Sequence, residues 1–126
     1  MGFWIFMLCM VILIPILMII FGAYFKNKSP KEINYIFGYR TTMSMKNNDT
    51  WQFAHSLIGK IWLYVGILLL IISVIPMIFT LHSDEKTVGI LGVILSFIDT
   101  GIMILTIIPV EKALKKNFDE NGKRKE

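Results

Sequence analysis

The ionisable side chain that stands out in this sequence is Asp99, at the centre of residues 88–110, a run that is otherwise uncharged. A lone carboxylate within a membrane helix costs about 2.5–3.5 kcal/mol on insertion scales, so it should face protein rather than lipid. Ser73 is one candidate partner, and the carbonyl of Val11, which Pro15 leaves without its helical hydrogen bond, is another. Two interpretations follow, a polar clamp between helices and a functional carboxylate that binds a ligand or a proton.

A second group of polar and aromatic residues lies between the first two apolar runs. Asn34 precedes the run Gly38-Tyr39-Arg40-Thr41, and Trp51 and His55 follow, four residues apart, where they would share one helix face. Arg40 offers a fork of five donors that suits a carboxylate, a lipid phosphate or the last carbonyls of a helix. This group either staples the loop to the helix ends or forms a binding site.

The elements that must position these residues are three apolar runs. Residues 2–25 and 61–81 contain no charged side chain, and residues 88–110 contain only Asp99. At about 21–24 residues each, they extend roughly 30–36 Å, enough to cross a hydrocarbon core. The composition, 55% hydrophobic and 17% charged, excludes a disordered chain, a disulfide scaffold and an ordinary soluble enzyme. We predict an all-α integral membrane bundle of three helices, 2–25, 57–81 and 88–110, forming a single domain over 1–126.

The distribution of Lys and Arg predicts the orientation. Six lie between the first and second runs, one lies between the second and third, and six follow the third. The positive-inside rule places the N-terminus outside, and the structured loop 26–56 and the tail 111–126 in the cytoplasm. The net charge of +4 is therefore a topology signal, and we expect no nucleic-acid partner. The first run lacks a basic n-region, so we expect it to remain as an anchor rather than to be cleaved as a signal peptide.

Capping signals predict where helices begin around the loop. The sequence Ser29-Pro30-Lys31-Glu32 is typical of a capping box, and it predicts a short amphipathic helix that Gly38 ends. Asp49 and Gln52 form a second pair of this kind, which predicts that the second membrane helix begins near Thr50. The loop is thus expected to be structured.

The third helix is expected to begin after Ser83 and to continue past Pro109 into the cytoplasm. An apolar stripe persists beyond the proline, and Gly122 is the predicted stop. The residues after it are polar and expected to be frayed.

Small and polar residues predict the faces on which the helices pack. Small side chains let helix backbones approach closely in lipid. In the second helix, small residues recur every seven positions, at Gly59, Gly66 and Ser73. In the third helix, small and polar residues lie close to one face, at Gly92, Ser96, Asp99 and Thr106. Helix packing is the simpler interpretation, and a substrate or peptide path along this face is the alternative.

This pattern resembles the SdpI family of small bacterial membrane proteins. The residues that carry the resemblance are Asn34, Gly38, Tyr39, Arg40, Thr41, Trp51, Ala54, His55 and Gly59, with a similar tail over 111–122. The resemblance implies a multi-pass protein in the plasma membrane of a bacterium. The member that gives the family its name is an immunity protein, which protects its cell from a secreted toxic peptide and holds a transcriptional repressor at the membrane.

Two functions are consistent with these features. The first is an interaction protein that gives immunity, or toxin resistance, against a membrane-active peptide, with a cytosolic regulator as the second partner that the resemblance implies. The alternative is a subunit of a small transporter or channel in which Asp99 lies on a proton or solute path. Three helices cannot enclose a path alone, so the alternative requires a homo-oligomer.

Catalytic chemistry has little support in the sequence. Cys9 lies within the first apolar run, and His55 and His82 fall on opposite sides of the predicted membrane, where they cannot share a metal. The sequence contains no H-E-x-x-H, P-loop or paired-carboxylate motif. We expect no enzyme, no catalytic residue, no cofactor and no metal site.

Overall fold

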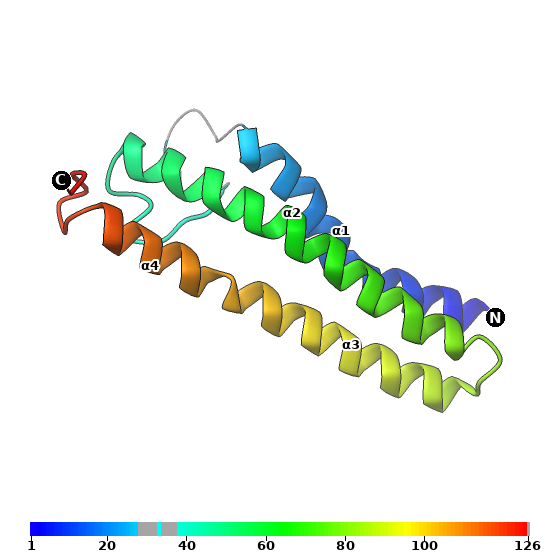
Figure 1. Cartoon of the computed structure of the whole chain (residues 1–126). Helices are drawn as coiled ribbons and strands as arrows, with labels where there is room; N and C mark the ends of the chain where they lie inside the picture. The colour runs from blue at the N-terminus through cyan, green and yellow to red at the C-terminus, as the bar shows by residue number, and fades with distance from the viewer. Residues whose placement is uncertain (28–32, 34–37, 126) are drawn as a thin grey trace.

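Long helices make up most of the chain in the computed structural model, which describes residues 1–27, 33 and 38–125. These residues form four helices, α1 (Gly2–Asn27), α2 (Asn48–Phe79), α3 (Glu85–Leu105) and α4 (Ile107–Asn117), and no strand (Figure 1). Three stretches of this part of the chain, α1, α2 and α3 with α4, are long and apolar enough to cross a membrane. The predicted all-α architecture with three membrane-spanning helices is confirmed. The predicted capping box at 29–32, and the short helix after it, lie outside the described residues.

The third membrane segment is broken at Thr106, where α3 gives way to α4. Pro109 has no backbone N–H, so it cannot bond to the carbonyl of Leu105 four residues before it, and the helix cannot continue unchanged. As the third residue of α4, Pro109 lies in the first turn, where an N–H would lack a helical partner in any case. The indole Nε1–H of Trp62 donates to the Thr106 hydroxyl at 2.9 Å, which ties the break to α2.

Two predicted helix boundaries are wrong. α2 begins at Asn48 rather than near Thr50, because Asn47 is its N-cap: the Asn47 side chain accepts from the Thr50 N–H at 2.9 Å, and Thr50 Oγ1 accepts from the Asn47 N–H at 3.1 Å. α4 ends at Asn117 rather than Gly122, because the backbone turns extended at Phe118. The predicted start of the third helix after Ser83 is confirmed, with Asp84 as its N-cap.

Glycines bring α1 and α2 together. A Cβ added at Gly22 would lie 2.5 Å from the backbone nitrogen of Leu63, and one added at Gly59 would collide with the backbone of Phe25 and Lys26. A Cβ at Gly66 would lie 3.0 Å from the Ile19 side chain. The predicted packing role of small residues on α2 is therefore present at Gly59 and Gly66.

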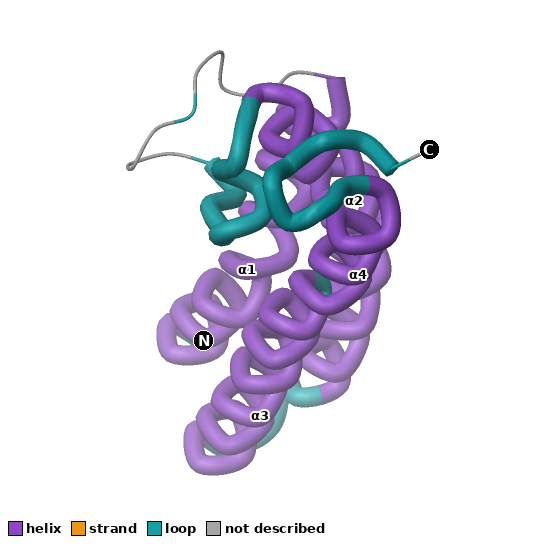
Figure 2. The backbone as a smooth tube through the Cα atoms, turned by 90° about the vertical axis from the view of Figure 1, so that its left-hand side faces the viewer, coloured by secondary structure: helices purple, strands orange, loops and turns teal. Residues whose placement is uncertain are grey.

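The bundle opens towards one end. α1 packs against α2 and α3, but in the described part of the chain no Cα atom of α1 lies within 8 Å of a Cα atom of α4. The loop 38–47 and the tail 118–125 lie at this end, and the N-terminus and the α2–α3 turn lie at the other (Figures 1 and 2). Each end has its own buried cluster: Phe25, Tyr39, Ala54, Ile58, Val110, Leu114 and Phe118 at the loop end, and Met7, Val11, Met77, Val88 and Leu95 at the other.

Candidate functional site

His55 fastens the loop to α2. Its side chain is completely buried, and its Nε2 accepts the backbone N–H of Tyr39 at 2.8 Å. Its Nδ1 lies 2.7 Å from the carbonyl oxygen of Trp51, one turn earlier in α2. Because Nε2 must accept and the carbonyl can only accept, the partners define a neutral imidazole with its proton on Nδ1. Both ring nitrogens are thus used in holding the loop.

Gly38 is the point where the loop backbone touches the aromatic pair on α2. Its φ is +117°, and a Cβ there would lie 2.6 Å from His55 Nε2 and 3.1 Å from the Trp51 ring. The Trp51 and His55 rings have centroids 4.3 Å apart, as their predicted shared face implies, and the Phe25 ring of α1 is 4.9 Å from that of His55. A side chain at position 38 would therefore be strained in conformation and would push the loop away from α2.

Ser44 closes the loop, a role that was not predicted from the sequence. Its Oγ accepts the Thr41 N–H at 2.8 Å and donates to the Tyr39 carbonyl at 2.9 Å, and the residue is completely buried. The Ser44 carbonyl in turn accepts the Thr50 hydroxyl at 3.1 Å. The signal that could have found it is the Thr41–Ser44 spacing, because hydroxyl side chains commonly bond to backbone groups two or three residues away in turns.

Arg40 and Thr41 lie on the rim of a cleft at the loop end of the bundle. The cleft has a volume of about 350 Å³ and is bounded by α1, α2 and the α3–α4 break. Its walls are mainly apolar and include Phe21, Ile104 and Ile107. Arg40 is exposed, so the cleft has a positively charged residue next to its apolar walls.

Two buried polar atoms at this end have no hydrogen-bond partner in the described part of the chain. They are the phenol oxygen of Tyr39, a residue only 9% exposed, and Oε2 of Glu111 on α4. Burial raises the pKa of the Tyr39 phenol above its usual range, and the charge of Glu111 raises it further. The phenol is therefore protonated at neutral pH.

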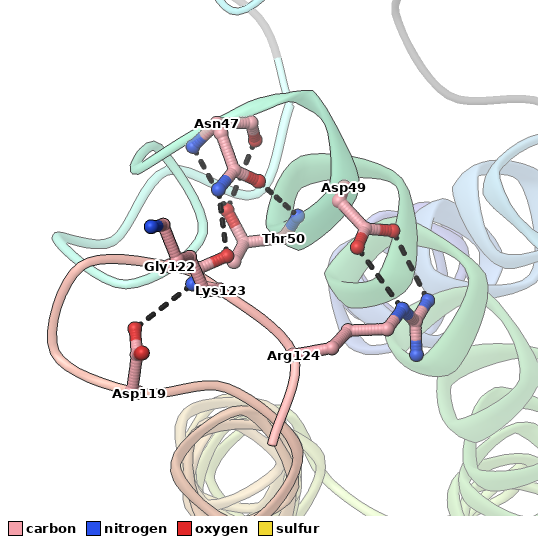
Figure 3. Close-up of polar contacts among 7 residues, drawn as sticks. All are labelled: Asn47, Asp49, Thr50, Asp119, Gly122, Lys123 and Arg124. Atoms are coloured by element: carbon pink, nitrogen blue, oxygen red, sulfur yellow. Dashed lines mark hydrogen bonds and ion pairs between the residues drawn. The ribbon is translucent and has the colours of Figure 1, made fainter. Parts of the chain in front are cut away.

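The C-terminal tail is folded onto the start of α2, and the predicted frayed end is wrong (Figure 3). Arg124 reaches Asp49 with two hydrogen bonds of 3.0 Å, and the Asn47 amide donates to the Gly122 carbonyl at 2.6 Å. Gly122 has φ +84°, and a Cβ there would lie 2.6 Å from Asn47 Nδ2, so this position needs glycine. Phe118, 1% exposed, anchors the turn.

Asp99 faces α2 inside the bundle. It is 1% exposed, and the Ser73 hydroxyl lies 3.0 and 3.1 Å from its two carboxyl oxygens. Of the two partners considered from the sequence, the structure shows the contact with Ser73. Ser96 is half-buried on α3, one turn before Thr100, whose hydroxyl donates to the Ser96 carbonyl at 2.9 Å.

The candidate residues predicted from the sequence fall into two separate groups in the structure. The predicted loop residues Gly38, Tyr39, Trp51 and His55 come together, whereas Asn34 lies outside the described residues. Asp99 and Ser73 form a separate pair within the bundle. Among the described residues, no group of three or more His, Cys, Asp or Glu side chains could hold a metal ion.

Three long apolar helices with a loop fastened at one end define a small multi-pass membrane protein. A family model described as the SdpI/YfhL protein family matches residues 31–110, and the chain belongs to that family. The matched span includes the loop and the residues of α2 that hold it. Comparisons with curated proteins and with solved structures give no match.

Proposed function

We propose that the chain is an immunity protein of a bacterial plasma membrane, protecting its cell against a membrane-active peptide. Membership of the SdpI/YfhL family is the main support. The observation that carries the proposal furthest is the fixed loop, in which His55 and Ser44 hold the backbone that presents Arg40. Such a preformed surface suits recognition of a partner and requires no catalysis.

The proposed orientation places the loop end in the cytoplasm. Nearly all Lys and Arg residues belong to the segments at that end, whereas Lys86 lies at the other. A cytosolic regulator would then meet the loop and the folded tail.

The peptide itself would be met within the bilayer. On the side opposite the loop, α2 ends at Phe79 and α3 begins at Glu85, so the connection is too short to form a receptor. Large apolar side chains line the outer faces of the helices, including Ile71, 51% exposed, and Phe97, 74% exposed. These faces contact lipid and can contact an apolar peptide.

A transporter or channel subunit working through Asp99 has less support. The carboxyl group is buried and both of its oxygens lie beside Ser73, an arrangement that favours a clamp between α2 and α3. We therefore retain immunity as the proposed function.

Expression in a strain sensitive to the toxic peptide of the family's namesake tests the proposal. Survival and membrane potential after peptide addition should both rise when the chain is present. The variant His55→Ala should lose protection, whereas the control Gln52→Ala, at an exposed site on the same helix, should keep it. Membrane levels of each variant are compared by immunoblotting. Unchanged killing at normal levels of the wild-type chain would contradict the proposal.

A further inference from the structure

The cleft at the loop end can be reached from the lipid side of the bundle. α1 lies next to α3 but diverges from α4, and the cleft lies where the helices separate. Phe21 of α1 forms one wall, and Ile104 of α3 and Ile107 of α4 form the other. Ile104 and Ile107 are 55% and 39% exposed, so they belong both to the cleft and to the lipid-facing surface. A molecule already in the bilayer can therefore enter sideways.

The polar groups of this cleft lie on the loop side. Arg40 supplies a permanent cation with several donors, and Thr41 lies beside it. Tyr39 also lines the cleft, but its phenol oxygen is buried, so Arg40 and Thr41 are the polar residues that a ligand can reach.

We propose that the cleft binds a membrane phospholipid, with the headgroup phosphate at Arg40 and an acyl chain against the apolar wall. The volume of about 350 Å³ is within the range of small-molecule sites and would hold part of the lipid. This inference does not rest on the proposed immunity function.

The charges around the cleft define the ligand further. Glu111 lies close enough to raise the pKa of the Tyr39 phenol. Glu111 itself is acidic and repels an anion, so binding of a phosphate depends on Arg40. Arginine pairs with phosphate through two parallel hydrogen bonds, which makes it the expected anchor.

Native mass spectrometry of the purified chain, with phosphatidylglycerol added at a fixed ratio, tests this directly. Arg40→Gln should lower the retained lipid by about tenfold, as expected for loss of a charge-assisted hydrogen bond. Ile104→Trp should lower it as well, by filling the cleft without changing its charge. The matched controls are Lys112→Gln, an exposed cation on α4, and Ile108→Trp, an exposed apolar site beside the cleft; both should retain lipid as the wild type does.

Tyr39→Phe is a further control, because it removes a buried hydroxyl that the lipid does not reach. This variant should retain phosphatidylglycerol as the wild type does, and the lipid-free protein should stay at least as stable. Inorganic phosphate at millimolar concentration should not displace the lipid, since the acyl chain contributes to binding. Equal retention by Arg40→Gln and Lys112→Gln, or full retention by Ile104→Trp, would overturn the proposal. Displacement by inorganic phosphate alone would also overturn it.

Discussion

The imidazole of His55 accepts the backbone N–H of Tyr39 at 2.8 Å, a contact that joins residues 16 positions apart. The other ring nitrogen of His55, Nδ1, lies 2.7 Å from the carbonyl oxygen of Trp51, and this contact fixes the orientation of the ring. The loop that contains Gly38 and Arg40 is therefore attached to a membrane helix through a buried side chain. Loss of that ring would release the loop as a unit.

Replacement of His55 by alanine should destabilise the protein by about 2–4 kcal/mol, because it leaves a buried N–H unpaired and a cavity behind. Unfolding by SDS in mixed micelles measures the change. Hydrogen exchange at the Tyr39 amide should accelerate in the same variant. In Gln52→Ala, at an exposed site, neither quantity should change, and slow exchange at Tyr39 in His55→Ala would contradict the role of the imidazole.

Alanine at Gly22 or Gly59 should weaken packing of α1 on α2. Each new Cβ meets backbone atoms that cannot move independently, so we expect a cost of about 1–3 kcal/mol, as for overpacked cores. Gly101→Ala is the matched control, because nothing lies within 4 Å of its Cβ position. It should be neutral or slightly stabilising, since alanine favours the helix. Equal effects of all three substitutions would show that helix propensity, not close approach, explains these glycines.

Ser73→Ala tests whether Asp99 acts as a clamp. Hydrogen bonds between membrane helices average about 0.6 kcal/mol and rarely exceed 1.7 kcal/mol, so the loss of stability should fall in that range. Asp99→Asn should cost less than Asp99→Leu, because an amide can still bond to the Ser73 hydroxyl. Ser96→Ala, at a half-buried serine on α3, serves as the control. A proton-coupled flux abolished by Asp99→Asn would instead support the transporter alternative.

The tail should be held mainly by Phe118 and only weakly by its ion pair. Arg124 and Asp49 have side chains 57% and 50% exposed, so Arg124→Gln should cost about 0.2–1 kcal/mol and less at high salt. Phe118→Ala removes a side chain 1% exposed and should cost about 3–5 kcal/mol. Limited proteolysis of the tail, compared with Lys125→Gln, reports both effects. Equal cleavage of Phe118→Ala and the control would contradict this anchor.

The membrane helices could be predicted from the sequence because their signal is local. An uncharged apolar run of this length is typical of a membrane-spanning helix. The face shared by Trp51 and His55 follows from helix periodicity alone. Ser73 was one of two partners predicted for Asp99, because only side chains at a similar depth in the bilayer can meet. The structure shows the Ser73 contact.

The remaining features depend on contacts between distant segments. The start of α2 was misplaced because several residues near it, including Asn47 and Asp49, can cap a helix. Asp49 instead pairs with Arg124, 75 positions away, and no local pattern indicates that partner. The folded tail was missed for the same reason, because a polar C-terminal sequence predicts fraying unless another surface holds it.

Cysteine labelling reveals on which side of the membrane the loop and the α2–α3 turn lie. Cys9 is first replaced by serine, and single cysteines are placed at Thr42 in the loop and at Ser83 in the α2–α3 turn, both exposed sites. With a membrane-impermeant maleimide, we expect Ser83→Cys to be labelled in intact cells and Thr42→Cys only after permeabilisation. Labelling of Thr42→Cys in intact cells, with Ser83→Cys protected, would place the loop outside the cell and contradict the predicted orientation.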